Sequence, residues 1–99
     1  MTNERREEKR VPALLEARWE GMSGKHTARI SDISTGGCFV ESLARVTIGE
    51  LIIFEIRMPD GDWLQIRGHV ASYDQHLGFS LCFTFLTDDE YRALALLIY

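Results

Sequence analysis

Apolar and polar residues alternate clearly in three segments of the chain, and each alternation predicts a β-strand that buries one face. The apolar members are Ile52, Phe54, Ile56 and Met58 in the first segment, Leu64, Ile66 and Val70 in the second, and Phe79, Leu81, Phe83 and Phe85 in the third. Successive side chains of a strand point to opposite faces, so a period of two places these residues on one side. The polar residues between them are expected to face solvent.

Turn-forming residues separate these strands from one another and from three strands predicted upstream. Asp60-Gly61, within the segment 59–62, supplies the positive φ that a tight hairpin requires. A second reversal is expected at residues 74–76. The upstream strands are predicted at residues 13–19 and 27–33, around a turn at 21–24, and at residues 38–42 after Gly36-Gly37. The pattern therefore predicts six strands.

The C-terminus changes from a strand period to a helical one. Thr87 and Glu90 have the spacing of a capping box, which predicts a helix over residues 87–98. Its predicted apolar stripe consists of Tyr91, Leu94, Ala95 and Ile98. Six strands suffice for a small barrel, and a helix over an open end would bury its stripe. We therefore expect a mainly β fold, a small six-stranded antiparallel β-barrel with a C-terminal α-helix, rather than an open sheet.

The composition fits one globular domain. The chain has 99 residues, 45% of them hydrophobic and 26% charged, which allows one core and excludes both two domains and general disorder. The first ten residues are polar and no stretch has about 20 apolar residues, so we expect a cytoplasmic protein without a signal peptide or membrane span. Cys38 and Cys82 are isolated thiols, which we expect to pack as small apolar groups in a reducing compartment.

Charge is distributed unevenly along the chain. Residues 1–29 hold seven Lys/Arg against five Asp/Glu, whereas residues 30–99 hold four against ten. We interpret this as a flexible Arg-rich arm over residues 1–10, followed by an acidic domain over residues 11–99. An acidic domain argues against DNA or RNA as a partner, because nonspecific affinity for nucleic acids depends on Lys and Arg at the phosphates.

Catalysis has little support in the sequence. The three histidines, His26, His69 and His76, share no metal-ligand spacing with one another or with the cysteines, and Ser34 has no histidine signature that would make it a nucleophile. We therefore expect neither an enzyme nor a bound metal or cofactor, and a hydrolase is the weakest of the functions considered.

Two short motifs remain that could bind a ligand. Arg5, Arg6, Lys9 and Arg10 place four cations within six residues, and Arg6 and Arg10 come within about 6 Å of each other if the segment turns. A solvated charged tail is the alternative interpretation. The second motif joins two strands and consists of Asp32, Ser34, Gly36 and Gly37. It could hold a ligand against the backbone, or it could simply be a turn whose side chains cap its own amides.

Taken together, the two motifs resemble the signatures of the PilZ domain, a bacterial receptor module for the second messenger cyclic di-GMP. Arg6 and Arg10 match the RxxxR signature, and Asp32, Ser34 and Gly37 match [D/N]xSxxG about 20 residues later. The chain is also similar to the layout of that family, a six-stranded barrel followed by a helix. It departs from many members in having Glu7 after the first arginine and in lacking a tryptophan after Val70.

The resemblance implies a non-catalytic receptor for cyclic di-GMP, with one or two nucleotides per chain and a downstream protein partner. The residues implied to contact the ligand are Arg5, Arg6, Arg10, Asp32, Ser34, Gly36 and Gly37. We expect the arm to order when the nucleotide binds, and we expect Arg5 to favour a stacked pair of nucleotides. The alternatives are a protein-interaction adaptor of the same fold that binds no nucleotide, for example one acting in pilus or motility functions, and a small barrel that binds RNA or single-stranded nucleic acid.

Overall fold

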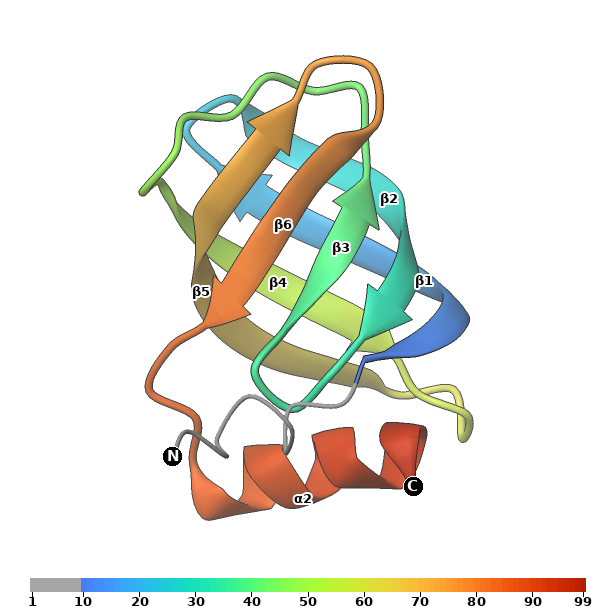
Figure 1. Ribbon diagram of the computed structural model, residues 1–99. Helices are drawn as coiled ribbons and strands as arrows, with labels where there is room; N and C mark the ends of the chain where they lie inside the picture. The colour runs from blue at the N-terminus through green and yellow to red at the C-terminus, as the bar shows by residue number, and fades with distance from the viewer. Residues whose placement is uncertain (1–9) are drawn as a thin grey trace, which may run out of the picture.

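The computed structural model describes residues 10–99, which form six strands and one helix (Figure 1). The strands are β1 (Val11–Gly21), β2 (Gly24–Ile33), β3 (Gly37–Glu41), β4 (Leu51–Arg57), β5 (Trp63–Asp74) and β6 (Gly78–Phe83), and the helix is α2 (Asp88–Ile98). All six predicted strands are present; β6 is shorter than the pattern indicated, and β1, β2 and β5 are longer. The segments that extend them, such as the end of β1, continue the pairing of the neighbouring hairpin.

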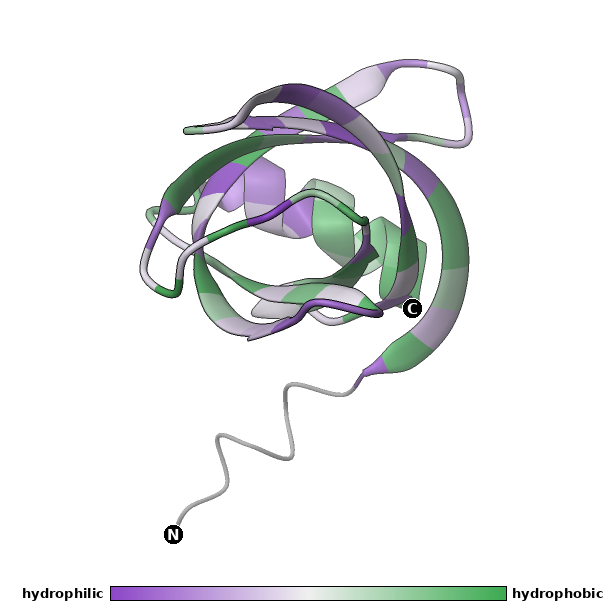
Figure 2. Ribbon diagram, turned by 90° about the horizontal axis from the view of Figure 1, so that it is seen from above, coloured by the Kyte–Doolittle hydropathy of each residue, from purple (hydrophilic) through white to green (hydrophobic). Residues whose placement is uncertain are grey.

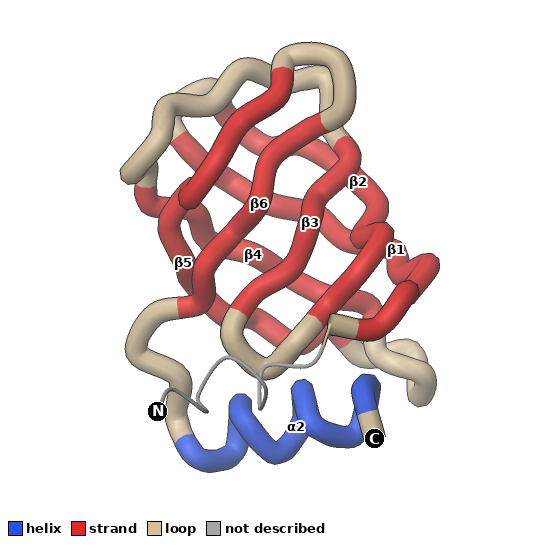
Figure 3. The backbone as a smooth tube through the Cα atoms, viewed as in Figure 1, coloured by secondary structure: helices blue, strands red, loops and turns tan. Residues whose placement is uncertain are grey.

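The six strands close into a barrel in the order β1-β2-β3-β6-β5-β4, and every neighbouring pair is antiparallel. Figure 3 shows the strands wrapping around the barrel, with α2 lying across one end. That end carries the start of β1, the β2–β3 turn, the β4–β5 hairpin and the connection from β6 to α2 (Figure 1). The mainly β barrel with a C-terminal helix is therefore confirmed.

The hydrophobic core fills the interior of the barrel. About every second side chain of a strand points into it. Figure 2 looks along the barrel and shows apolar and polar residues alternating around its wall. The largest fully buried side chains include Phe54, Phe79, Ile30, Ile33, Ile52, Ile56, Ile66 and Leu81. These residues come from β2, β4, β5 and β6, and for β4, β5 and β6 the alternation in the sequence identified the core face.

The predicted turns are also confirmed. Gly24 and Gly61 have φ values of 111° and 94°, which glycine adopts without strain. In the third turn the carboxylate of Asp74 accepts hydrogen bonds from the amides of His76 and Leu77, at 2.8 and 3.2 Å. The helix begins with the predicted capping box, because Thr87 accepts from the amide of Glu90 and Glu90 accepts from the amide of Thr87.

Three expectations about side chains are wrong. Phe85 is not part of the core face: β6 ends at Phe83, and Phe85 is 89% exposed because the chain leaves the barrel there with a φ of 53°. Tyr91 is half exposed, since the first turn of α2 is tied to β5 through Glu90 and the buried contact is made by Leu94. Cys82 is exposed, because its neighbours Leu81 and Phe83 take the inward positions of β6.

Candidate functional site

Arg10 and Asp32, which are 22 residues apart in the chain, form an ion pair at the helix end of the barrel. The Arg10 Nη1 atom donates to the Asp32 Oδ1 atom at 2.5 Å. The register of β1 and β2 places Pro12 opposite Asp32, so the residue that precedes β1 reaches the carboxylate near the end of β2. Both side chains remain partly in solvent, with 48% of Arg10 and 38% of Asp32 exposed. The pairing of strands thus brings the two sequence motifs together.

Ser34 is buried and organises the turn between β2 and β3. Its Oγ atom accepts hydrogen bonds from the amides of Gly36 and Gly37, both at 3.1 Å, and donates to the carbonyl of Gly37 at 3.3 Å. The Ser34 amide donates to the same carbonyl at 2.8 Å. Of the two interpretations open for this motif, the structure contains the self-capped turn. This turn fixes the position of the backbone beside the Arg10–Asp32 pair.

Gly36 and Gly37 join the turn to β6. A Cβ atom on Gly37 would lie 2.3 Å from the carbonyl oxygen of Leu81, so only glycine fits at this position. The amide of Phe83 donates to the carbonyl of Gly36 at 2.9 Å. The close approach that Gly37 permits is therefore to the backbone of β6.

The inner side of this site is apolar. Cys38 follows the turn, is buried, and has a raised pKa because burial disfavours the thiolate. The thiol therefore stays neutral beneath the exposed ion pair. Charge at this end of the barrel lies on the solvent side, where a ligand could reach it.

Five of the seven predicted site residues lie together at this end of the barrel: Arg10, Asp32, Ser34, Gly36 and Gly37. The predictions for Arg5 and Arg6, and for an arm over residues 1–10, fall almost wholly outside the described residues.

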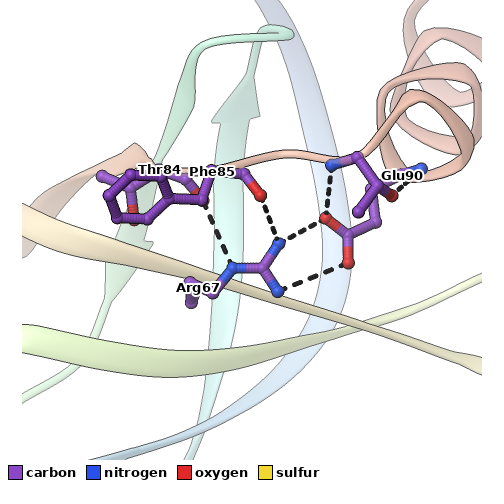
Figure 4. Close-up of polar contacts among 5 residues, drawn as sticks. Arg67, Thr84, Phe85 and Glu90 are labelled. Atoms are coloured by element: carbon purple, nitrogen blue, oxygen red, sulfur yellow. Dashed lines mark hydrogen bonds and ion pairs between the residues drawn. The ribbon is translucent and has the colours of Figure 1, made fainter.

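A second polar cluster at the same end fixes the connection between β6 and α2 (Figure 4). The guanidinium of Arg67 on β5 pairs with the Glu90 carboxylate at 2.5 Å and donates to the carbonyls of Thr84, at 3.3 Å, and Phe85, at 2.8 Å. The pKa of Glu90 is lowered, first by the hydrogen bond from the Thr87 amide and then by Arg67. The sequence indicated Glu90 through its capping box. It carried no signal for Arg67, which occupies an ordinary polar position of an alternating strand.

A comparison with protein families assigns the fold and both motifs to one family. The PilZ domain matches residues 4–99. The chain belongs to the PilZ domain family. The match starts before Arg5 and includes both signatures, so the resemblance seen in the motifs is confirmed at the level of the family.

Solved structures with the same PilZ fold differ widely from this chain in sequence. The Bacillus subtilis inhibitor of motility, MotI/DgrA, superposes with a TM-score of 0.81 at 19% identity, covering 95% of this chain and 49% of that one. The PilZ domain of CeSA from a cellulose-synthesizing bacterium gives 0.71 at 18% identity, covering 91% and 94%. Escherichia coli YcgR, solved in complex with c-di-GMP, gives 0.74 at 21% identity, covering 95% and 44%. No curated protein matches the sequence significantly.

This PilZ chain spans about half the length of MotI/DgrA and YcgR, and nearly all of the CeSA domain. Within residues 10–99, no helix is long and apolar enough to cross a membrane. Among the same residues there is no cluster of three or more His, Cys, Asp or Glu side chains that could hold a metal ion.

Proposed function

We propose that this PilZ domain is a non-catalytic receptor for cyclic di-GMP, which it binds at the helix end of the barrel through Arg5, Arg6, Arg10, Asp32, Ser34, Gly36 and Gly37. The observation that carries the proposal is the ion pair between Arg10 and Asp32, because it unites one residue of each motif at one place. Membership of the family supports the choice of ligand, as does the presence of the same nucleotide in the YcgR structure.

The chemistry of the ligand suits arginine. Cyclic di-GMP carries two phosphates and two guanines, and each guanine offers the acceptors O6 and N7. A guanidinium can bridge two phosphate oxygens or the O6 and N7 of guanine, and its flat face can stack on a purine. Hydrogen bonds to a charged group contribute about 1.5–3 kcal/mol each, so a few such contacts from Arg10 and the arm suffice for micromolar binding.

Asp32 gives the proposed site its preference for guanine. Its carboxylate can accept from guanine N1 and N2, and adenine has no such donors on that edge. In the structure this carboxylate already accepts a hydrogen bond from Arg10. An ion pair this exposed contributes about 1 kcal/mol or less to stability, so exchanging it for bonds to the ligand costs little.

The turn of Ser34, Gly36 and Gly37 holds the backbone around Asp32 in a fixed geometry. Because the Ser34 hydroxyl already bonds three backbone groups, we assign it chiefly a positioning role in the site. Preorganised backbone lowers the entropy cost of binding, which then falls mainly on the arm. Ordering of residues 1–10 around the nucleotide would change the surface presented to a protein partner and so transmit the signal.

The proposal is tested by titration calorimetry of the purified protein with cyclic di-GMP, with GTP as a competitor. We expect saturable binding that GTP does not displace and that weakens with added salt. Arg10→Ala and Asp32→Ala should each weaken binding by at least about tenfold, the loss of one charge-assisted bond. The number of nucleotides bound per chain tests the expected role of Arg5 directly, since one nucleotide would contradict a stacked pair.

Arg18→Ala is the matched control. Arg18 pairs with Glu55 at 2.5 Å with an exposure of 47%, almost the same as Arg10, but it lies along the barrel wall. Its substitution should leave the affinity for the nucleotide unchanged. If the wild-type protein binds no cyclic di-GMP, the receptor proposal is wrong and the chain is an adaptor of the same fold.

A further inference from the structure

An apolar groove lies at the helix end of the barrel, between the β4–β5 hairpin and the C-terminal half of α2 (Figure 1). Its volume is about 470 Å³, within the range of pockets that bind ligands. Met58 and Trp63 of the hairpin line one side of the groove, and Leu96 and Leu97 of α2 line the other. Leu96 is 82% exposed, so this apolar surface is open to solvent.

Contacts within the barrel hold the hairpin side of the groove in place. The amide of Met58 donates to the carbonyl of Asp62 at 2.7 Å. Arg18 and Arg57 stack against Trp63, with their guanidinium carbons 3.9 and 5.0 Å from the centre of the ring. Neither arginine lines the groove. A partner therefore meets an ordered indole, which lowers the entropy cost of binding.

The charged residues of the groove are acidic. Asp60 and Asp62 line its border, and among residues 10–99 no Lys or Arg lines it. Both aspartates are exposed. The Asp60 carboxylate accepts a hydrogen bond from the amide of Asp62 at 2.9 Å, which fixes the turn that carries both charges. The border of the groove thus presents two carboxylates from a defined turn.

The C-terminal end of α2 adds to this negative charge. The last carbonyls of a helix carry partial negative charge, which is stabilised by Lys or Arg in the last turn. Within Asp88–Ile98 the last turn has no basic residue. Leu96 and Leu97 of the groove belong to this turn. An apolar surface beside two carboxylates and an uncompensated helix end is complementary to a partner that is both apolar and positively charged.

We propose that this groove binds a basic amphipathic helix of a partner protein. The apolar side chains of that helix pack between Trp63 and Leu96, and its Lys or Arg side chains pair with the aspartates of the hairpin. Helices bind apolar grooves through anchors three or four residues apart, and tryptophan is a frequent centre of such contacts. The acidic border argues against nucleic acid or an anionic membrane as the occupant. The groove shares no residue with the proposed nucleotide site.

An NMR titration of the isotope-labelled protein with a synthetic peptide, without nucleotide, tests the proposal. The probe is a peptide of about 15 residues with leucine on one helical face and lysine on the other, long enough to form a helix. We expect saturable binding that shifts the indole N–H signal of Trp63 but not that of Trp19, which is 2% exposed inside the barrel. A peptide with glutamate in place of lysine should bind at least about tenfold more weakly.

One pair of variants tests the apolar contact. Leu96→Asp should fold, because Leu96 is exposed, and should weaken binding of the lysine peptide at least about tenfold. Leu43→Asp is the matched control. Leu43 is 84% exposed in the β3–β4 loop, at the other end of the barrel, and its substitution should leave the affinity unchanged.

A second pair tests the charges. Asp60→Asn combined with Asp62→Asn removes two charges but keeps the side-chain oxygen that caps the turn. It should weaken binding about three- to tenfold, with the larger loss at low salt. Glu20→Gln combined with Glu41→Gln makes the same change in net charge at exposed positions near the other end of the barrel, and it should leave the affinity unchanged.

Four results would overturn the proposal: no binding of the lysine peptide, equal affinity for the glutamate peptide, an unmoved Trp63 signal, or equal losses in the variants and their controls. Sedimentation equilibrium tests a second copy as the occupant. A dimer that forms in the wild type and is absent in Leu96→Asp would overturn the proposal in favour of that copy. The titrations contain no nucleotide, so their failure leaves the receptor proposal standing, and failure to bind cyclic di-GMP leaves the groove proposal standing.

Discussion

The two ends of the barrel use charged residues in opposite ways. At the end without the helix, Glu50 is buried, and its carboxylate accepts hydrogen bonds from the amides of Met22, at 2.8 Å, and Thr47, at 2.9 Å. It thereby ties the β1–β2 turn to the β3–β4 loop. At the helix end, Asp32 is partly exposed and accepts a hydrogen bond from the guanidinium of Arg10, which is more exposed still.

This difference separates a carboxylate that stabilises the fold from one that is available to a ligand. Removing the buried Glu50 carboxylate leaves two part-buried hydrogen-bonding amides without their acceptor, which costs desolvation that no other bond offsets. Removing an exposed partner returns the other group to water at little cost. The helix end therefore combines a rigid turn, built on Ser34 and Gly37, with a charged pair that can change partners. The following variants test this contrast, in order of decreasing effect on stability.

Gly37→Ala tests the rigid part of the helix end. The added Cβ would lie 2.3 Å from the Leu81 carbonyl, so β3 and β6 must separate, and we expect the free energy of unfolding to fall by about 3 kcal/mol. Chemical denaturation measures the change. If the stability is unaltered, the β2–β3 turn can move to admit the methyl group. The helix end would then have no rigid turn to set against the exchangeable Arg10–Asp32 pair.

Glu50→Ala tests the opposite end. The amides of Met22 and Thr47 lose their acceptor, and we expect a loss of about 2 kcal/mol in the free energy of unfolding. The affinity for cyclic di-GMP should not change. Glu41→Ala, at an exposed glutamate, is the control and should change stability by less than about 0.5 kcal/mol.

Ser34→Ala tests the turn that holds Asp32. Two glycine amides lose a buried acceptor, and we expect a loss of about 1.5 kcal/mol together with weaker nucleotide binding. Ser72→Ala, at an exposed serine of β5, is the control for loss of a hydroxyl. If Ser34→Ala lowers stability but leaves binding intact, the positioning role assigned to Ser34 is wrong.

The pH dependence of stability tests the connection to α2. The pKa of Glu90 is lowered in the folded protein, so its ionised form stabilises the fold above the ordinary pKa of a glutamate, and this contribution disappears as the pH falls through the lowered value. Thermal unfolding at a series of acidic pH values should show a smaller decline in Glu90→Gln than in the wild type. Equal declines in the two proteins would contradict this.

Asp32→Asn sharpens the comparison most, because we expect it to change stability least. The ion pair with Arg10 is exposed, so the free energy of unfolding should fall by less than about 0.5 kcal/mol. Nucleotide binding should nevertheless be lost or greatly weakened. A double-mutant cycle with Arg10→Ala measures the coupling free energy of the pair. A value above about 1 kcal/mol would show that Asp32, like Glu50, is a carboxylate that stabilises the fold.

Most of the fold could be predicted from local pattern. The alternation along β4, β5 and β6 identified the inward faces, since the side-chain period of a strand is fixed by its backbone. The alternation could not show where β6 ends, because Phe85 continues the pattern while the backbone turns away. Tyr91 had the right helical spacing, but the ion pair between Arg67 and Glu90 determines how the first turn of α2 sits on the barrel.

The motifs of the site were visible in the sequence, whereas their proximity was not. Asp32 and Ser34 lie two residues apart, so their local turn follows from residue chemistry. Arg10 meets Asp32 only because β1 and β2 pair in one particular register. The same holds for Glu50, whose two amide donors come from separate loops.

The sequence by itself determined the family, the six strands, the capped helix and the residues of both motifs, because each of these depends on neighbours within a few positions. Tertiary structure alone decided which carboxylates are buried, which strand neighbours a side chain meets and which apolar residues remain outside. These features depend on the closure of the barrel, which brings together residues that no local pattern connects.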